Sequence, residues 1–97
     1  MNFNERIWEL TKKIPKGKVT TYKALAEAAG SNAYRAVGNA MNKNPHAPFV
    51  PCHRVVASTG HLHGYAYGLD KKKKLLESEG VEVVNGKVNL SKYFVRV

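Results

Sequence analysis

The residues best suited to covalent chemistry lie in the stretch PFVPCHRVV, residues 48–56. Cys52 is the only cysteine of the chain, and His53 follows it directly. A thiolate is a strong nucleophile, and an imidazole can take the thiol proton directly or through one water. Neighbours on an extended strand point to opposite faces, so this pairing requires a turn or a bridging water. The alternative is that Cys52 is a buried, inert small hydrophobic residue.

A third group must orient the histidine if His53 is to act as a general base. The chain carries seven acidic residues, and Glu79 is the strongest candidate among them. It ends an amphipathic segment that holds Leu75 and Leu76, and it stands just before Gly80. We therefore expect a partly buried carboxylate that can pair with the histidine.

The same region allows a metal-binding interpretation. Cys52, His53, His61 and His63 could supply four ligands, and the last two would share one face of a strand. Their spacing, C-H-x7-H-x-H, matches no common zinc pattern. We predict that the protein uses no metal and no other cofactor.

The balance of charge indicates a polyanionic partner. Sixteen Lys and Arg residues stand against seven Asp and Glu residues, which gives a formal net charge of +9 and a pI near 9.9. Charge of this density on a small domain is typical of nucleic-acid binding. A membrane surface is a weaker candidate, because no basic amphipathic helix with a bulky apolar face is present. Solubility alone is the remaining explanation.

Length and composition favour one small intracellular domain. A chain of 97 residues can bury one modest core, and we treat residues 1–97 as a single domain that acts as a monomer. No apolar run approaches the ~20 residues that cross a bilayer, and the N-terminal residues do not resemble a secretory signal. A single cysteine cannot form an internal disulfide, so we expect a reducing compartment, either the cytoplasm and nucleoid or the nucleus.

Apolar spacing predicts a helix followed by a helix-turn-helix in the first half of the chain. Ile7, Leu10 and Ile14 share one face of the first helix. The segments 19–30 and 33–44 form the next two helices. The tight, glycine-containing turn between them is typical of a helix-turn-helix.

Caps and a buried face can be assigned within the same segments. Thr20 or Thr21 can cap the second helix, and Ser31 or Asn32 can cap the third. We expect the buried stripe of the third helix to contain Tyr34, Val37 and Met41.

The third helix is unusual on its outward side. Ala36, Gly38 and Ala40 are small, and a glycine in mid-helix costs about 1 kcal/mol relative to alanine. Either the glycine packs closely against the preceding helix, or the third helix must enter a narrow groove such as the ~6 Å minor groove of DNA. Few longer polar side chains are available there, Arg35 and Asn39 among them, which indicates weak sequence specificity.

The second half of the chain contains β elements around one more helix. The stretch 48–58 is β-rich, and residues 59–68 are typical of a turn and hairpin. A helix over 69–80 follows, and we expect its lysines, Lys71–Lys74, to form a solvated face rather than contact phosphate. Asn85-Gly86 predicts a further hairpin. The predicted fold is α+β, a mainly helical winged helix-turn-helix domain with short β hairpin or wing elements.

Five segments resemble the O6-alkylguanine-DNA alkyltransferases, also called methylated-DNA–protein-cysteine methyltransferases. They are IPKGKVTTYKALAEAAG, RAVGNAMNKNP, PFVPCHRVV, GYAYGL and KLLESEG, in the order and spacing of that family. The resemblance extends from about residue 3 to residue 80. It implies the DNA-binding, catalytic half of such a protein, without the N-terminal domain that many members carry.

The resemblance implies direct repair of double-stranded DNA that contains O6-alkylguanine. The damaged base is flipped out after minor-groove binding, and its alkyl group moves to Cys52 in one irreversible displacement. The family roles of water-mediated proton acceptor and orienting carboxylate fall on His53 and Glu79. Asn44 and Tyr65 complete the implied catalytic set.

The same resemblance implies the DNA contacts. Tyr22 matches the tyrosine that presses on the phosphate of the target nucleotide. Arg35 matches the arginine that fills the vacated base stack. We expect further contacts from the outward side of the third helix, at Ala36, Gly38 and Asn39.

The substrate pocket is expected to contain Met41, Pro51, Val55, Ala66 and Tyr67. Tyr67 departs from the family pattern, in which many members have a smaller residue at this position. Its ring could narrow the pocket against bulky adducts, stack on the base, or merely line a hairpin. We favour a contact with the pocket.

Two other functions are compatible with the sequence. An alkyltransferase-like damage sensor binds O6-alkylguanine without repairing it, but such proteins replace the acceptor cysteine that Cys52 supplies here. A winged-helix transcription regulator would carry an inert or redox-sensing cysteine, and the small outward side of the third helix argues against it. The favoured interpretation is a single-turnover, or suicide, DNA methyltransferase.

Overall fold

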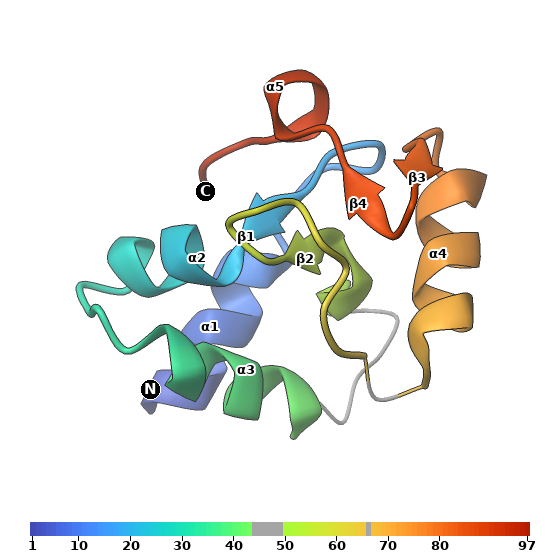
Figure 1. Ribbon diagram of the computed structural model, residues 1–97. Helices are drawn as coiled ribbons and strands as arrows, with labels where there is room; N and C mark the ends of the chain where they lie inside the picture. The colour runs from blue at the N-terminus through green and yellow to red at the C-terminus, as the bar shows by residue number, and fades with distance from the viewer. Residues whose placement is uncertain (44–49, 66) are drawn as a thin grey trace.

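The computed structural model describes residues 1–43, 50–65 and 67–97, in which helices combine with two small sheets (Figure 1). In chain order the elements are α1 (Phe3–Thr11), β1 (Thr20–Thr21), α2 (Tyr22–Ala28), α3 (Tyr34–Asn42), a 3₁₀ turn (Cys52–Arg54), β2 (Val55–Val56), α4 (Leu69–Ser78), β3 (Val83–Val84), β4 (Lys87–Val88) and α5 (Leu90–Tyr93). The predicted mixture of helices and short strands is confirmed. Asn44 and Ala66 lie outside the described residues.

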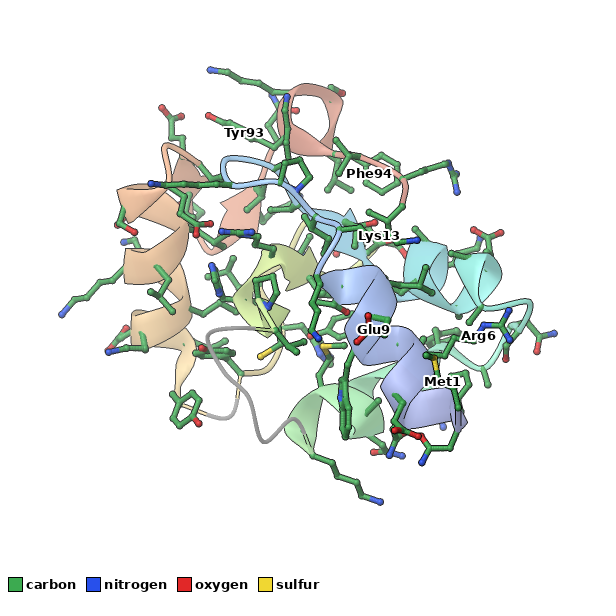
Figure 2. All side chains as sticks on the ribbon, turned by 180° about the vertical axis from the view of Figure 1, so that it is seen from behind. Met1, Arg6, Glu9, Lys13, Tyr93 and Phe94 are labelled. Atoms are coloured by element: carbon green, nitrogen blue, oxygen red, sulfur yellow. The ribbon has the colours of Figure 1, made fainter. Side chains whose placement is uncertain are left out.

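Helices α1, α2 and α3 pack around the first apolar core, with α1 behind the other two in Figure 1. Ile7 and Ile14 are buried in this core and Leu10 is partly buried, as the apolar spacing predicts. The indole Nε1 of Trp8 donates a hydrogen bond to the carbonyl of Ala40 at 2.8 Å and so ties α1 to α3. Figure 2 shows the outer face of α1, which carries the exposed side chains of Arg6 and Glu9, and the exposed Lys13 in the turn that follows.

A tight turn joins α2 to α3. The hydroxyl of Thr21 caps α2 by accepting a hydrogen bond from the N–H of Ala24 at 3.0 Å. The cap prediction for α3 is wrong, because its N-cap residue is Ala33 rather than Ser31 or Asn32. The Ser31 hydroxyl instead accepts from the Ala33 N–H at 3.0 Å, so it stabilises the turn before the helix.

Two burial predictions for α3 are also wrong. Tyr34 is 53% exposed, and Ala40 is fully buried rather than outward-facing. The stripe of α3 that enters the core consists of Val37, Ala40 and Met41. Tyr34 is the first residue of the helix and is left outside this stripe, on the surface.

A short parallel pairing connects the two halves of the chain. Strand β1 pairs with β2, with Thr20 opposite Val55 and Thr21 opposite Val56. The predicted β character of residues 48–58 is therefore limited, because Cys52–Arg54 form a 3₁₀ turn before the strand begins. This pairing places the start of α2 beside the end of the cysteine-containing turn.

The hairpin at Asn85-Gly86 is confirmed, since β3 and β4 are antiparallel and both turn residues have positive φ, 52° and 73°. The predicted hairpin within 59–68 is wrong. His61 instead forms an isolated bridge with Lys87 of β4, because this segment pairs with a later part of the chain. Among the described residues, no helix is long and apolar enough to cross a bilayer.

A second apolar core lies between α4, the β3–β4 hairpin and the parallel strands, with Leu62 and Leu76 among its buried members. The hairpin and α4 stand on the opposite side of the molecule from α1 and α3 (Figure 1). The C-terminal segment forms α5, and Phe94 beyond it forms a parallel bridge with Val19. The two cores meet at β2, which contributes Val55 to the first and Val56 to the second.

Gly60 supports the contact between residues 57–61 and β4. It has a φ of +91°, and an added Cβ would overlap the carbonyl oxygen of Val88, whose N–H donates to Gly60 at 2.8 Å. We expect Gly60→Ala to lower the free energy of unfolding by about 3 kcal/mol, from backbone strain and overlap together.

Urea denaturation followed by circular dichroism measures this loss, with Gly30→Ala as the matched control. Gly30 also has a positive φ, +75°, but nothing lies within 4 Å of an added Cβ. The control should therefore show the backbone cost alone. Equal losses in the two variants would refute the overlap with Val88.

Candidate active site

Cys52 begins the 3₁₀ turn and is buried, with 5% of its surface exposed. The turn is closed by a hydrogen bond from the Arg54 N–H to the Pro51 carbonyl at 2.9 Å. The Cys52 N–H donates to the Val50 carbonyl at 2.8 Å. This curvature replaces the extended geometry that would send the side chains of Cys52 and His53 to opposite faces.

Glu79, the C-cap residue of α4, joins His53 to Arg54. Its Oε1 lies 3.2 Å from Nε2 of His53. The Arg54 guanidinium donates to both carboxylate oxygens, from Nε at 2.9 Å and from Nη2 at 2.6 Å, and its Nη1 donates to the Ile14 carbonyl at 2.8 Å. These side chains are nearly buried, with 3% of His53, 10% of Glu79 and 16% of Arg54 exposed. Burial and the two-point contact fix the carboxylate beside the imidazole.

The environment of this cluster favours a neutral imidazole and an ionised carboxylate. Burial lowers the pKa of His53 below its ordinary 6.5, although the Glu79 carboxylate acts in the opposite direction. Burial alone would raise the pKa of Glu79, but its hydrogen bond to Arg54 and its contact with His53 lower that pKa below 4.5. A neutral ring beside a carboxylate holds its proton on the nearer nitrogen, Nε2, which leaves a lone pair on Nδ1. Both ring nitrogens are buried without a well-directed hydrogen bond in the described part of the chain, so Nε2 meets Glu79 only through the 3.2 Å contact and Nδ1 faces no such group.

The depressed pKa values predict that the protein loses stability on acidification. As the pH falls through 6.5, the unfolded chain binds a proton at His53 while the folded protein does not, so the free energy of unfolding decreases. Protonation of Glu79 in the unfolded chain extends this loss below pH 4.5.

Urea midpoints measured from pH 7.5 to pH 4 should decline in this order. His53→Gln should flatten the upper part of the decline, and the matched control His61→Gln, at an exposed histidine, should not. A decline that His53→Gln leaves unchanged would contradict the assignment.

The prediction of a solvated face over Lys71–Lys74 is wrong for Lys72, whose side chain is fully buried. Its ammonium donates to the carbonyls of Val55, Leu62 and Gly64 at 2.7, 2.5 and 3.0 Å. Burial lowers the pKa of Lys72 to about 8, and the charge of Cys52 acts in the opposite direction. Lys72 thus ties β2 to the segment that follows it.

Two tyrosines lie within electrostatic range of the thiol. Burial raises the pKa of Tyr22 and of Tyr65 to about 12, and the Cys52 charge adds to both shifts. Both phenols are therefore protonated at physiological pH and can donate hydrogen bonds. The ring of Tyr22 also meets His63 edge-on, with ring centroids 5.8 Å apart.

A cavity of about 630 Å³ opens between helices α2 and α3, Cys52 and residues 57–65. Its described lining contains two permanent cations, three tyrosines and no carboxylate. The lining residues are Tyr22, Lys23, Tyr34, Arg35, Gly38, Asn39, Met41, Asn42, Cys52, Ala57, Ser58, His63, Gly64 and Tyr65. This composition suits an anionic ligand that also presents an aromatic ring.

The structure brings many of the predicted site residues together. Those that line the cavity are Cys52, Tyr65, Tyr22, Arg35, Gly38, Asn39 and Met41. His53 follows Cys52 in the 3₁₀ turn and contacts Glu79, and neither of the two lines the cavity. The predicted Asn44 and Ala66 lie outside the described residues.

Four predicted contacts are not among the residues that line the cavity. Pro51 and Val55 are buried, Val55 within the first core, and Ala36 is half-buried. Tyr67 is 62% exposed, and its ring packs edge-on against Tyr65 with centroids 5.5 Å apart.

Lys72 and several residues of the cavity lining were not predicted as parts of the site; Tyr34, Lys23 and His63 are the most prominent of those in the lining. A signal for Lys72 was available, because it lies four residues before the buried Leu76 and therefore on the same helical face. In the described part of the chain, no three His, Cys, Asp or Glu residues gather as metal ligands, so the four-ligand interpretation finds no such cluster there.

The mixed helix-and-sheet fold thus brings a buried thiol, a His–Glu pair and a basic cavity together. Residues 2–81 match the family model described as "6-O-methylguanine DNA methyltransferase, DNA binding domain", and the chain belongs to this family. The family resemblance stated from the five sequence segments is thereby confirmed.

Individual relatives agree with this assignment. Methylated-DNA–protein-cysteine methyltransferase of Methanosarcina barkeri is 49% identical over 79 residues, which cover 80% of this chain and 50% of the relative. O6-methylguanine-DNA methyltransferase from Pyrococcus kodakaraensis superposes with a TM-score of 0.76 at 48% identity, over 84% of this chain and 47% of that structure. S. pombe Atl1, in complex with damaged DNA containing O6-carboxymethylguanine, superposes with a TM-score of 0.88 at 33% identity.

Coverage differs between these relatives. The chain spans about half the length of the curated methyltransferases it matches. The Atl1 superposition instead covers 98% of this chain and 95% of that structure. The match to the methyltransferases therefore concerns their DNA-binding domain.

Proposed function

We propose that this protein repairs O6-alkylguanine in double-stranded DNA by transferring the alkyl group irreversibly to Cys52. The observation that carries the proposal is the position of Cys52 in the lining of a basic, tyrosine-rich cavity, with the His53–Glu79 pair adjoining it. The names of the relatives, methylated-DNA–protein-cysteine methyltransferases, support this reaction class. A thioether is stable, so each molecule acts once.

The proposed reaction is a single displacement. Sγ of Cys52 attacks the alkyl carbon, the new C–S bond forms as the bond from carbon to O6 breaks, and the bond electrons pass to the purine. The thiol proton passes through a bridging water to Nδ1 of His53, and Glu79 stabilises the resulting imidazolium. His53 releases its proton to water and the purine takes up one proton from water, so that guanine leaves as the neutral base, while the neutral hydroxyl of Tyr65 donates a hydrogen bond to it. We also assign a catalytic role to Asn44.

We propose that residues 1–97 act as one winged helix-turn-helix unit, with α3 entering the minor groove and the β3–β4 hairpin as the wing. The space around Gly38 supports this, because no atom of the described residues lies within 4 Å of an added Cβ. The internal packing alternative would require close neighbours there. Arg35 is exposed, and both Arg35 and Tyr22 line the cavity. In the proposed complex Arg35 occupies the place of the extruded base, and Tyr22 contacts the phosphate of the extruded nucleotide.

Mass spectrometry of the intact protein tests the proposal. After incubation with a duplex that contains O6-methylguanine, we expect a gain of one methyl group on a peptide that contains Cys52. Cys52→Ala should gain none, while an unmodified guanine duplex should leave the wild type unchanged. These controls separate transfer from nonspecific alkylation.

Two other outcomes would reject methyl transfer. Tight binding to the damaged duplex without a mass change would identify a damage sensor. Sequence-selective binding to undamaged DNA would identify a regulator. Anisotropy measurements on labelled duplexes distinguish these two results.

A further inference from the structure

Tyr34 is a large aromatic residue on the surface at the start of α3. It is 53% exposed, and it belongs to the cavity lining together with its neighbour Arg35. A single exposed apolar side chain is ordinary, so its place in the cavity lining is the observation that points to a ligand contact.

The ring of Tyr34 contributes to neither apolar core of the described residues. Tyr34 is absent from both apolar cores and from the partly buried residues that pack on them. Its side chain forms no hydrogen bond or ring stack with another described residue. The other cavity tyrosines differ, since Tyr22 meets His63 and Tyr65 meets Tyr67.

The surroundings of Tyr34 suit a stacked nucleobase. Lys23 and Arg35 supply positive charge to the cavity, and no described lining residue carries a carboxylate. Aromatic side chains bind bases through their faces with little regard to sequence, which fits the weak specificity expected from α3. An aromatic wedge can also hold apart base pairs that a protein has unstacked.

We propose that Tyr34 is a second wedge residue, which stacks on the base pair beside the extruded nucleotide while Arg35 occupies the vacated position. This inference rests on the proposed function, because it requires a nucleotide to leave the duplex. It assigns Tyr34 to duplex engagement and not to the chemistry at Cys52. The phenol hydroxyl is not required.

Transfer rates on two substrates test the assignment. We compare Tyr34→Ala, Tyr34→Phe and the matched control Leu69→Ala, which removes an exposed apolar side chain outside the cavity lining. Loss of one stacked aromatic should lower the rate on an O6-methylguanine duplex about 10-fold. The rate on the free base O6-methylguanine and the urea midpoint should not change. Tyr34→Phe and Leu69→Ala should behave as the wild type.

Several results would overturn the proposal. Tyr34→Ala with the full duplex rate would do so, as would an equal loss on duplex and free base, which would place Tyr34 in the pocket chemistry. A Tyr34→Phe variant as impaired as Tyr34→Ala would assign the effect to the hydroxyl.

A binding measurement separates this proposal from the proposed function. If the wild type gains no methyl group from either substrate, the proposed function fails. Tyr34→Ala is then compared in the Cys52→Ser background by fluorescence anisotropy, with a labelled duplex that contains O6-methylguanine. About 10-fold weaker binding supports the wedge, and unchanged binding rejects it.

Discussion

Glu79→Gln is expected to slow methyl transfer about 100-fold and to lower the free energy of unfolding by about 3 kcal/mol. The amide keeps the volume of the side chain but removes the charge that pairs with Arg54 and faces His53. Arg54 would then be a largely buried cation without its carboxylate. His53 would lose the group that opposes the effect of burial on its pKa, so its basicity would fall further.

Mass spectrometry of samples quenched at set times measures the loss of transfer rate, and urea denaturation measures the loss of stability. Glu77→Gln is the matched control. Glu77 lies on the same helix but is exposed. The pH profile separates orientation of the base from simple instability. In Glu79→Gln, the acidic limb of the rate profile should move to lower pH, because a less basic imidazole stays neutral further into the acid range. A slower reaction with an unmoved profile would count against the His53–Glu79 pair.

Lys72→Met should have the second largest effect, with a transfer rate reduced about 100-fold on both the duplex and the free base. The ammonium holds three carbonyls, of which two belong to the segment that contributes His63, Gly64 and Tyr65 to the cavity. Methionine fills a similar volume but donates no hydrogen bond. The cavity wall would therefore shift relative to Cys52.

The exposed neighbour Lys73 provides the control, since Lys73→Met removes the same charge from the same helix. A global charge effect on DNA binding would reduce duplex repair in both variants and spare the free base. Loss of repair on both substrates only in Lys72→Met would support the positioning role. We also expect the free energy of unfolding of Lys72→Met to be about 2 kcal/mol lower than that of the wild type.

Local signals in the sequence were sufficient for much of the fold. The apolar stripe of the first helix, the Thr21 cap and the Asn85-Gly86 hairpin each depend on residues close together in the chain. The pairing of Glu79 with His53 joins distant residues. The sequence predicts this pairing because Glu79 stands beside the apolar Leu75 and Leu76, and the family resemblance assigns the same role to Glu79.

The errors arose where distant contacts override local preference. A run of four lysines indicates a solvated helix face, whereas three carbonyls, one from β2 and two from residues 62–64, compensate for the burial of Lys72. Tyr34 shares a helical face with the buried Val37, yet it is 53% exposed and belongs to neither apolar core. Neither outcome can be read from spacing alone.

The contacts around Cys52 also determine when in folding its surroundings are completed. Arg54 bonds partners 40 residues earlier and 25 residues later, and Lys72 reaches back 17 residues to Val55. Contacts of such separation close slowly, because the chain must first lose the entropy of the intervening loops. Helices α2 and α3, built from neighbouring segments, can form earlier. We therefore expect a refolding chain to regain these helices before it completes the surroundings of Cys52.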